Sequence, residues 1–451
     1  MNNQQQGQTD FANLTPEEKY QQRMAAWKSV EGMEFDSDEI TQSYQQRVQR
    51  LRDVIELKQP DRLPSIMMVG GYYANFAGIT QGDTYYNAQK TARAVIQFME
   101  EFQPDYGAGA FPSAGRAYDH LGYNIYKWPG GALPETTSFQ YVEGEYMTVE
   151  EYDGLINDPT GYMLRTYLPR VFDNLKGLAL APNFFKAIEL TEVPGMLMPL
   201  TIPQVRESFE TLFRAADSLK EELKVTGATA REITRRWGAP AWMGAIAFAP
   251  FDIIGDSMRG TRGILTDLRR RPDKVLAACE AVVPASIQMA TAMRSRGGAP
   301  IVFMPLHKGA DGFMSQEQFE IFYWPFLKKQ LDGIIAEGIV PLLFVEGGYN
   351  ERLDFLADAD LPEGRSIWLF DRTDMRAAKE KIGGRVCIAG NVPSSLFATG
   401  APEKMDEYCR QLIETAGKGG GFILTSGCPI DQAVSENAHA FFEAARKYGI
   451  Y

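Results

Sequence analysis

Six short apolar runs, each followed by an amphipathic helical segment, constrain the fold of this chain more than any other feature. They are "SIMMVG" (65–70), "APIVFMPL" (299–306), "VPLLFVE" (340–346), "SIWLF" (366–370), "RVCIAGN" (385–391) and "GFILTSGC" (421–428). Continuous apolar strands that alternate with helices are typical of a parallel sheet buried on both faces. With "PDYGAGAF" (104–111) and "MGAIAFAPF" (243–251) the count reaches eight. Eight such units favour a closed (β/α)₈ TIM barrel over an open doubly wound sheet.

The remaining segments are predicted to surround this barrel. Residues 1–13 are polar and rich in Gln and Asn, which predicts a disordered N-terminus. Residues 14–60 are predicted to form an N-terminal helical extension, because Thr15 suits a helix N-cap and amphipathic segments follow it. The barrel is then expected over residues 61–451. Residues 112–240 hold only one or two candidate core strands, so we expect elaborated loops over the barrel mouth, together with helices.

Charge and apolar content exclude several classes of protein. The chain has 46 Lys and Arg against 58 Asp and Glu, a net charge of −12, which argues against nucleic-acid binding. The longest apolar run, "MGAIAFAPFDIIG" (243–255), is too short for a membrane span and contains Pro250 and Asp252. The first residues lack the basic start and apolar core of a signal peptide. Four cysteines in 451 residues do not form a disulfide framework, so we expect a cytoplasmic protein with reduced thiols.

Polar side chains stand where several predicted strands end, which is where barrel enzymes place their active sites. They are His307, Glu346, Asp371, Asn391 and Cys428. We predict catalytic roles for Glu346, His307, Asp371 and Asn391. A convergence of His, carboxylate and Cys is also typical of a metal site.

Each of these residues also has a plainer interpretation. A lone buried thiol such as Cys428 is commonly a small hydrophobic residue, and one histidine can simply satisfy a backbone carbonyl. Glu346 could cap the following turn or pair with an arginine, and Asp371 could form a local ion pair with Arg372. Cys387 begins its strand about 13 Å below the strand end and is predicted to pack at the barrel floor.

Four stretches of the chain resemble the uroporphyrinogen decarboxylase superfamily. They are "SMRGTRGILTDLRRRPDKVLAACEAV" (257–282), "MSQEQFEIFYWPFLKKQLDGI" (314–334), "RVCIAGNVPSSLFATGAPEKM" (385–405) and "GGGFILTSGCPIDQAVSENAHAFFEAARKYG" (419–449). The resemblance spans roughly residues 60–451, is most specific in the last 200, and implies a (β/α)₈ barrel. The true decarboxylases carry an arginine-containing motif in the first strand region that binds porphyrinogen carboxylates. Here the segment after residue 66 has no arginine before Arg93, so porphyrinogen decarboxylation is not expected.

The other branch of that superfamily comprises corrinoid-linked methyltransferases with a zinc site. Its ligands are a His-x-Cys-Gly after one strand and a Cys after the last. Cys428 falls on the last cysteine, Glu346 on the first one, and Phe344 where the family has histidine. The resemblance therefore implies zinc held by Glu346 and Cys428. His307, at the preceding strand end, is the third ligand that barrel geometry offers, with Asp371 as the alternative.

The predicted activity is O-demethylation. A methyl group would pass from a methoxylated, aromatic donor to the cob(I)alamin of a separate corrinoid protein, since the chain shows no corrinoid-binding motif of its own. Tyr72, Tyr73 and Phe76 are predicted to wall the donor pocket, although such side chains also serve ordinary packing. The sequence leaves the oligomeric state open, a homodimer included.

Two alternatives come from other functional classes. One is a metal-free decarboxylase or lyase of the same fold that acts on a small carboxylate. It would need a pocket arginine, for which Arg116, Arg259 and Arg262 are available. The other is a non-catalytic barrel that serves as a binding or scaffold protein.

Overall fold

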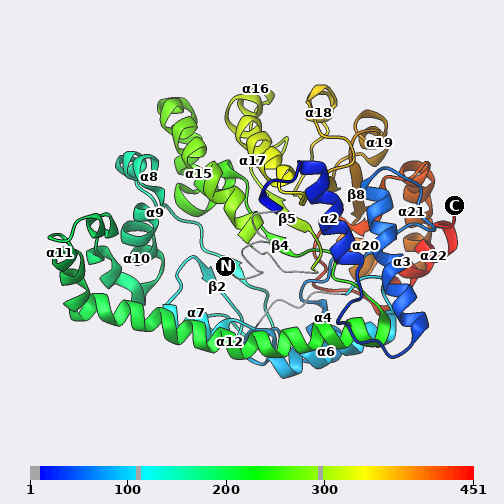
Figure 1. Ribbon diagram of the computed structural model, residues 1–451. Helices are drawn as coiled ribbons and strands as arrows, with labels where there is room; N and C mark the ends of the chain where they lie inside the picture. The colour runs from blue at the N-terminus through cyan, green and yellow to red at the C-terminus, as the bar shows by residue number, and fades with distance from the viewer. Residues whose placement is uncertain (1–10, 108–112, 293–297) are drawn as a thin grey trace.

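The computed structural model describes residues 11–107, 113–292 and 298–451, and places a curled parallel sheet inside a layer of helices (Figure 1). Within these residues seven strands pair in the order β1-β9-β8-β7-β6-β5-β4. The strands are β1 (Ser65–Ile66), β4 (Ala245–Ile246), β5 (Ile301–Leu306), β6 (Val340–Val345), β7 (Ile367–Phe370), β8 (Cys387–Val392) and β9 (Phe422–Ser426). All neighbouring pairs are parallel, which confirms the predicted TIM-barrel-like fold.

The eighth predicted strand, 104–111, is described only in part. Gly107 forms a parallel bridge with Ala241, a few residues before β4, and its N–H donates to the carbonyl of Pro240 at 2.9 Å. Residues 108–112 lie outside the described residues. The described end of this run therefore pairs beside β4, as an eighth barrel strand would.

Side chains of each strand alternate between the barrel interior and the helix layer. On β6, Leu342 and Phe344 belong to the interior cluster, whereas Leu343 and Val345 pack in the cluster shared with the outer helices. Because side chains alternate with a period of two, the residue after Val345 returns to the interior row. Glu346 therefore extends from the strand end toward the barrel mouth.

The outer layer consists of helices that follow the strands (Figure 1). The longer ones are α6 (Ala88–Phe102), α14 (Gly260–Arg270), α15 (Pro272–Ala292), α17 (Trp324–Ala336), α21 (Pro402–Leu412) and α22 (Ser435–Tyr448). Shorter ones are α18 (Leu353–Asp358) and α19 (Met375–Lys381). Within the described ranges no helix combines the length and the apolar character needed to span a membrane.

Two N-terminal helices, α2 (Pro16–Lys28) and α3 (Asp38–Ile55), close the barrel at the N-terminal ends of its strands. Lys19 pairs with Glu337 at 2.9 Å, just before β6 begins. Cys387 is fully buried in the same cluster as Trp27, which confirms that it packs at the barrel floor. The division of the chain at residue 60 stays a prediction, and of the N-terminus predicted to be disordered, residues 1–10 lie outside the described residues.

Residues 113–240, which we call the insertion, contain helices, as predicted for this stretch, and also a small hairpin. The hairpin pairs β2 (Tyr126–Lys127) with β3 (Gln140–Tyr141) in antiparallel fashion. The short helices include α7 (Gly115–Leu121), α8 (Tyr152–Asn157), α9 (Pro159–Tyr162), α10 (Leu168–Val171) and α11 (Val193–Leu197). The insertion ends in the 35-residue helix α12 (Pro203–Trp237), which runs along one side of the molecule in Figure 1.

Candidate active site

Asp252 binds the backbone at the end of β5. It terminates the helical turn α13 (Pro250–Asp252), which follows β4, and is almost completely buried. Its carboxylate accepts the backbone N–H groups of His307 and Lys308, each at 3.0 Å, and the hydroxyl of Tyr323 at 2.8 Å. Burial, with a further contribution from the charge of Asp256, raises the pKa of Asp252 to about 6. This carboxyl group therefore fixes where His307 leaves the strand.

His307 is held between two carboxylates at the barrel mouth. Its Nδ1 lies 2.6 Å from Asp256, and its Nε2 lies 3.4 Å from Glu346. Burial lowers the pKa of His307, but the hydrogen bonds with Asp256 and Glu346 and the charge of Asp252 outweigh it and raise the pKa to about 11. The imidazole is consequently a cation at neutral pH.

Asp256 sits on the π-helical segment η6 (Ile253–Met258) and joins two cations. Besides His307, it binds the ammonium group of Lys308 at 2.8 Å. Burial raises the pKa of Asp256, but the hydrogen bond with His307 and the two positive charges hold it below its ordinary value. Single π-helical turns within helices frequently mark functional sites. Asp256 is therefore an ionised carboxylate that orients the His307 ring.

Glu346 faces His307, and its other neighbour is Asp371. The Glu346 side chain is 46% exposed, so it opens to the mouth. The N–H of Gly347 donates to Asp371 at 3.3 Å. Burial raises the pKa of Asp371, and the charge of Glu346 adds to this effect. Glu346, His307 and Asp371 therefore meet at one end of the barrel, as the strand ends predicted.

Cys428 follows β9 and is half-buried. Burial raises the pKa of its thiol, and the charges of Asp371, Asp431 and Glu346 raise it further, although a hydrogen bond with Ser394 lowers it. The three carboxylates thus lie close enough to act on Cys428 electrostatically. The thiol shares the mouth with the other predicted residues and is held in its neutral form.

Asn391 has a positioning role in the described geometry. It is 7% exposed, and its amide nitrogen donates to the carbonyls of Asp371 at 3.2 Å and Thr373 at 2.9 Å. These bonds fix the turn that follows β7. The structure thus shows Asn391 supporting the turn of Asp371, and its predicted catalytic role stays a prediction.

The predicted zinc ligands His307, Glu346 and Cys428 lie at the same mouth without surrounding a common point. Among the described residues, no group of three or more His, Cys, Asp and Glu side chains is arranged to hold a metal ion. Both ring nitrogens of His307 face carboxylates, Nδ1 at 2.6 Å from Asp256 and Nε2 at 3.4 Å from Glu346. The side chains as placed do not fit zinc, and the zinc site stays a prediction.

The predicted donor-pocket residues Tyr72, Tyr73 and Phe76 pack in the core. Tyr72 and Tyr73 are 2% and 6% exposed, and Tyr73 meets Phe98 edge-on at 5.3 Å between ring centroids. Phe76 contacts Phe102 at 5.2 Å. The short helix α4 (Tyr72–Ala77) packs these rings onto α6. The packing alternative is therefore the one that the structure supports.

Aromatic residues of the insertion contact the site. The Tyr141 hydroxyl donates to the carbonyl of Asp256 at 2.5 Å, and the Tyr167 hydroxyl donates to that of Ser257 at 2.7 Å. Tyr126 packs edge-on against Tyr141, with centroids 5.3 Å apart. The insertion thereby holds η6, the segment that carries Asp256.

Sequence reasoning missed Asp252, Asp256 and Lys308. The signal was present, because the two aspartates are four residues apart in "FDIIGD" directly after the predicted strand 243–251. Residues at this spacing share one helix face. Reading the end of that strand in the same way as the later strand ends would have found both aspartates.

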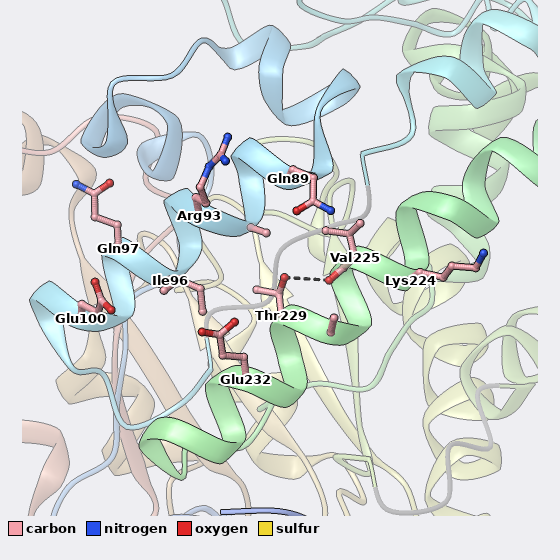
Figure 2. A pocket seen from close by; sticks show the side chains of 11 residues that line it. Gln89, Arg93, Ile96, Gln97, Glu100, Lys224, Val225, Thr229 and Glu232 are labelled. Atoms are coloured by element: carbon pink, nitrogen blue, oxygen red, sulfur yellow. Dashed lines mark hydrogen bonds between the residues drawn. The ribbon is translucent and has the colours of Figure 1, made fainter. Parts of the chain in front are cut away.

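A separate hollow lies on the outer layer, between α6 and α12. Its volume is about 750 Å³, and Figure 2 shows its lining side chains, among them Arg93, Glu100 and Glu232. Arg236 binds both Glu100 and Glu232, at 2.6 and 3.2 Å. None of the predicted site residues lines this hollow. Arg93, the first arginine after β1, therefore lines the outer hollow, which is separate from the predicted site.

Comparison with protein families gives one match over more than half of the chain. The family described as "Uroporphyrinogen decarboxylase (URO-D)" matches residues 190–448. The solved structure of a methyltransferase from Methanosarcina mazei has a TM-score of 0.56 at 16% identity, and covers 88% of this chain and 98% of its own. At this identity the likeness is one of fold.

Curated proteins named uroporphyrinogen decarboxylase are similar at lower coverage. The one from Idiomarina loihiensis is 30% identical over 143 residues, which is 30% of this chain and 38% of the relative. The one from Cellvibrio japonicus is 27% identical over 44% of this chain and 54% of the relative. The one from Klebsiella pneumoniae is 22% identical over 70% of this chain and 90% of the relative. The first relatives are thus matched over about half of their length or less.

Proposed function

Because the chain belongs to the uroporphyrinogen decarboxylase family, we propose that it is a methyltransferase built on this barrel. It transfers a methyl group from a methoxylated aromatic donor to the reduced cobalt of a cobalamin carried by a separate corrinoid protein. The observation that carries the proposal is the His307 cation, which Asp256 holds at the mouth opposite Glu346. The fold shared with a methyltransferase from Methanosarcina mazei supports it.

His307 supplies the hydrogen-bond donor that departure of a phenolate requires. When the bond between the methyl carbon and the oxygen breaks, the electron pair stays on the oxygen, whose conjugate acid has a pKa near 10 in a phenol such as tyrosine. The pKa of His307 is about 11, so it stays protonated at neutral pH and is closely matched to this oxygen. A donor placed where negative charge develops stabilises the transition state. The leaving oxygen binds beside Nε2, while Glu346 stays close enough to keep His307 protonated.

The remaining residues position this donor. Asp256 fixes the ring through Nδ1, Asp252 fixes the backbone of His307, and Asn391 supports the turn of Asp371. Reduced cobalamin, when its carrier is bound, supplies the nucleophile that accepts the methyl group. We assign no step to zinc, because the described side chains do not surround a metal position.

The test is an assay of methyl transfer from a panel of methoxylated aromatics to free cob(I)alamin. The absorption of methylcobalamin measures the product. We expect turnover with at least one methoxybenzene, and a loss of about 10²-fold or more in His307→Gln. His439→Gln is the matched control, since this histidine lies on α22 and pairs with Glu101 of α6 in the outer layer. No transfer from any donor, with or without added zinc, would refute the proposal.

Decarboxylation is the second candidate, because the curated relatives carry that name. It needs a cation free to bind a substrate carboxylate. Arg259 is buried and already binds Asp267 at 2.6 Å, together with Glu145 and the carbonyl of Met147. Arg116 and Arg262, the other arginines considered, are exposed. Release of CO₂ from uroporphyrinogen by the purified chain would favour this candidate over methyl transfer.

A further inference from the structure

The small hairpin of the insertion contacts the barrel mouth at two points. On one side, the Tyr141 hydroxyl donates to the carbonyl of Asp256 at 2.5 Å. On the other side, the Ser138 hydroxyl donates to the carboxylate of Asp431 at 3.1 Å. Asp256 follows β4 and Asp431 follows β9. The segment 138–141 therefore runs along the mouth from the end of β9 to the end of β4.

Three aromatic rings share the face of the hairpin that is turned to the site. Tyr126 lies opposite Tyr141 in the register of β2 and β3, and their ring centroids are 5.3 Å apart. Phe139 stands two residues before Tyr141, so strand alternation places both side chains on one face. The Phe139 ring accordingly packs on Tyr126, at 5.9 Å between centroids. Because Tyr141 reaches Asp256, this face, which we call the aromatic face, is turned to the mouth.

Phe139 is exposed although it belongs to the aromatic face. It is 58% exposed, whereas Tyr126 and Tyr141 are half-buried. Burial raises the pKa of Tyr126, and the negative charge of Asp256 raises it further, so this ring lies near the site. Across the mouth the Glu346 side chain is 46% exposed. Solvent therefore adjoins both the aromatic face and the strand ends opposite it.

An exposed aromatic ring beside a site is suited to bind another ring. Aromatic rings pack offset or edge-on, with centroids about 4.5–7 Å apart, and gain more than the burial of their area alone provides. Tyr72, Tyr73 and Phe76, which were predicted to wall the donor pocket, pack in the core instead. The aromatic face offers the ring surface that they do not.

The charges at the mouth favour an uncharged ring. Three carboxylates act together on the thiol that follows β9, and they are Asp371, Asp431 and Glu346. His307 and Lys308 both pair with Asp256. Arg372 pairs with Asp371 at 3.5 Å. A carboxylate on the substrate would therefore meet like charges, while these three cations are already paired.

We propose that the aromatic face binds the ring of an uncharged methoxylated aromatic donor, with Phe139 stacking on that ring. This inference rests on the proposed function and narrows its class of donor. It places the donor between the hairpin and the strand ends that carry His307 and Glu346. Phe139 then determines affinity and selectivity for the donor and takes no part in bond breaking.

Binding of two ethers of similar size, measured without cobalamin, tests the proposal. Methoxybenzene has an aromatic ring, whereas methoxycyclohexane does not. Phe139→Leu keeps an apolar side chain, so in an NMR titration we expect the Kd of methoxybenzene to rise about 5-fold and that of methoxycyclohexane less than about 2-fold. Phe139→Tyr should bind methoxybenzene as the wild type does. In the wild type, 4-methoxybenzoate should bind at least about 10-fold more weakly than methoxybenzene.

The matched control is Phe213→Leu. Phe213 is 68% exposed on α12, away from the hairpin, and its replacement should change neither Kd. Methyl transfer to free cob(I)alamin is the second readout. In Phe139→Leu we expect the KM for methoxybenzene to rise about 5-fold, with kcat unchanged.

The two readouts separate this proposal from the proposed function. The aromatic face is refuted if the wild type does not bind methoxybenzene, if Phe139→Leu binds it unchanged, or if both ethers lose affinity equally. Binding of 4-methoxybenzoate as tight as that of methoxybenzene would also overturn the proposal. Each of these results counts against the aromatic face even when methyl transfer occurs. Binding that changes as expected, with no methyl transfer from any donor, would refute the proposed function and leave an aromatic-binding site.

Discussion

The barrel segment 298–451 and the insertion 113–240 place their residues by different means. In the barrel segment, strands β5 to β9 pair in chain order, and the register of each pair sets the height of every side chain. Within residues 113–240, the described strands belong only to the small hairpin. The insertion reaches the site through single contacts, such as the Tyr167 hydroxyl on the carbonyl of Ser257.

This difference separates the residues that define the chemistry from those that tune it. The backbone at the mouth of the barrel segment is fixed by a ladder of hydrogen bonds between strands, so the positions of its residues change only if the sheet moves. The insertion holds one segment, η6, through two tyrosine hydroxyls and through the backbone N–H groups of Tyr146 and Met147, which donate to the carbonyl of Met258. Loss of one such bond should therefore shift the site slightly, whereas a cavity inside the barrel should destabilise the whole fold.

The largest difference between the two regions should be in stability, when a phenylalanine inside the barrel and one in the insertion are each replaced by alanine. Phe344 is 3% exposed and stacks on Phe303 at 5.7 Å, whereas Phe139 of the insertion is 58% exposed. We expect Phe344→Ala to lower the free energy of unfolding by about 3–5 kcal/mol. Phe139→Ala should change it by no more than about 0.5 kcal/mol. Urea denaturation measures both, and equal losses would mean that the two regions do not differ in this way.

The regular part of the fold was readable from the sequence because its pattern is repetitive. The runs 301–306, 340–345 and 422–426 are continuous apolar strands with helices between them, and the structure confirms all three. The arrangement of the insertion was not readable. Its 35-residue helix α12 does not pack beside a predicted barrel strand that would fix its position. Its place depends on side-chain packing against η3 (Asp173–Leu180).

The candidate site was predicted in part for the same reason. His307, Glu346 and Asp371 follow long strands, so their convergence could be derived from strand ends. Asp256 follows the two-residue strand β4 (Ala245–Ile246) and comes into place through a π-helical turn. Aromatic composition alone could not separate Tyr73 in the core from Tyr141 at the site. Only the direction of their helices and strands distinguishes them.

The second prediction concerns the charge that holds His307. Asp256→Asn keeps the shape of the side chain but removes the charge and the acceptor that raise the pKa of His307. We expect the pKa of His307 to fall from about 11 toward its ordinary value, and methyl transfer to slow by about 10²-fold. The chain has three histidines, so the imidazole NMR signal that is lost in His307→Gln identifies this residue.

Stability should follow the same titration. Because the pKa of His307 is raised in the folded protein, its pair with Asp256 stabilises the fold fully below about pH 6.5. This contribution to stability is lost as the pH rises toward 11. In Asp256→Asn, the free energy of unfolding should decrease less between pH 6.5 and pH 11 than it does in the wild type. Asp354→Asn is the matched control, because this exposed carboxylate pairs with Lys381 on the outer surface. An unchanged His307 titration in Asp256→Asn would contradict the assignment.

The smallest effect, and the sharpest test of the comparison, comes from two tyrosines of the insertion. Tyr167→Phe removes the hydroxyl that binds the carbonyl of Ser257 on η6, whereas Tyr162→Phe removes one that binds Glu151 within the insertion at 3.2 Å. Each should lower the free energy of unfolding by about 0.5–1.5 kcal/mol. Only Tyr167→Phe should also lower kcat several-fold with KM unchanged, because η6 carries the carboxylate that orients His307. If both variants lose stability and neither changes kcat, the insertion merely covers the barrel, and the site is set by the strands alone.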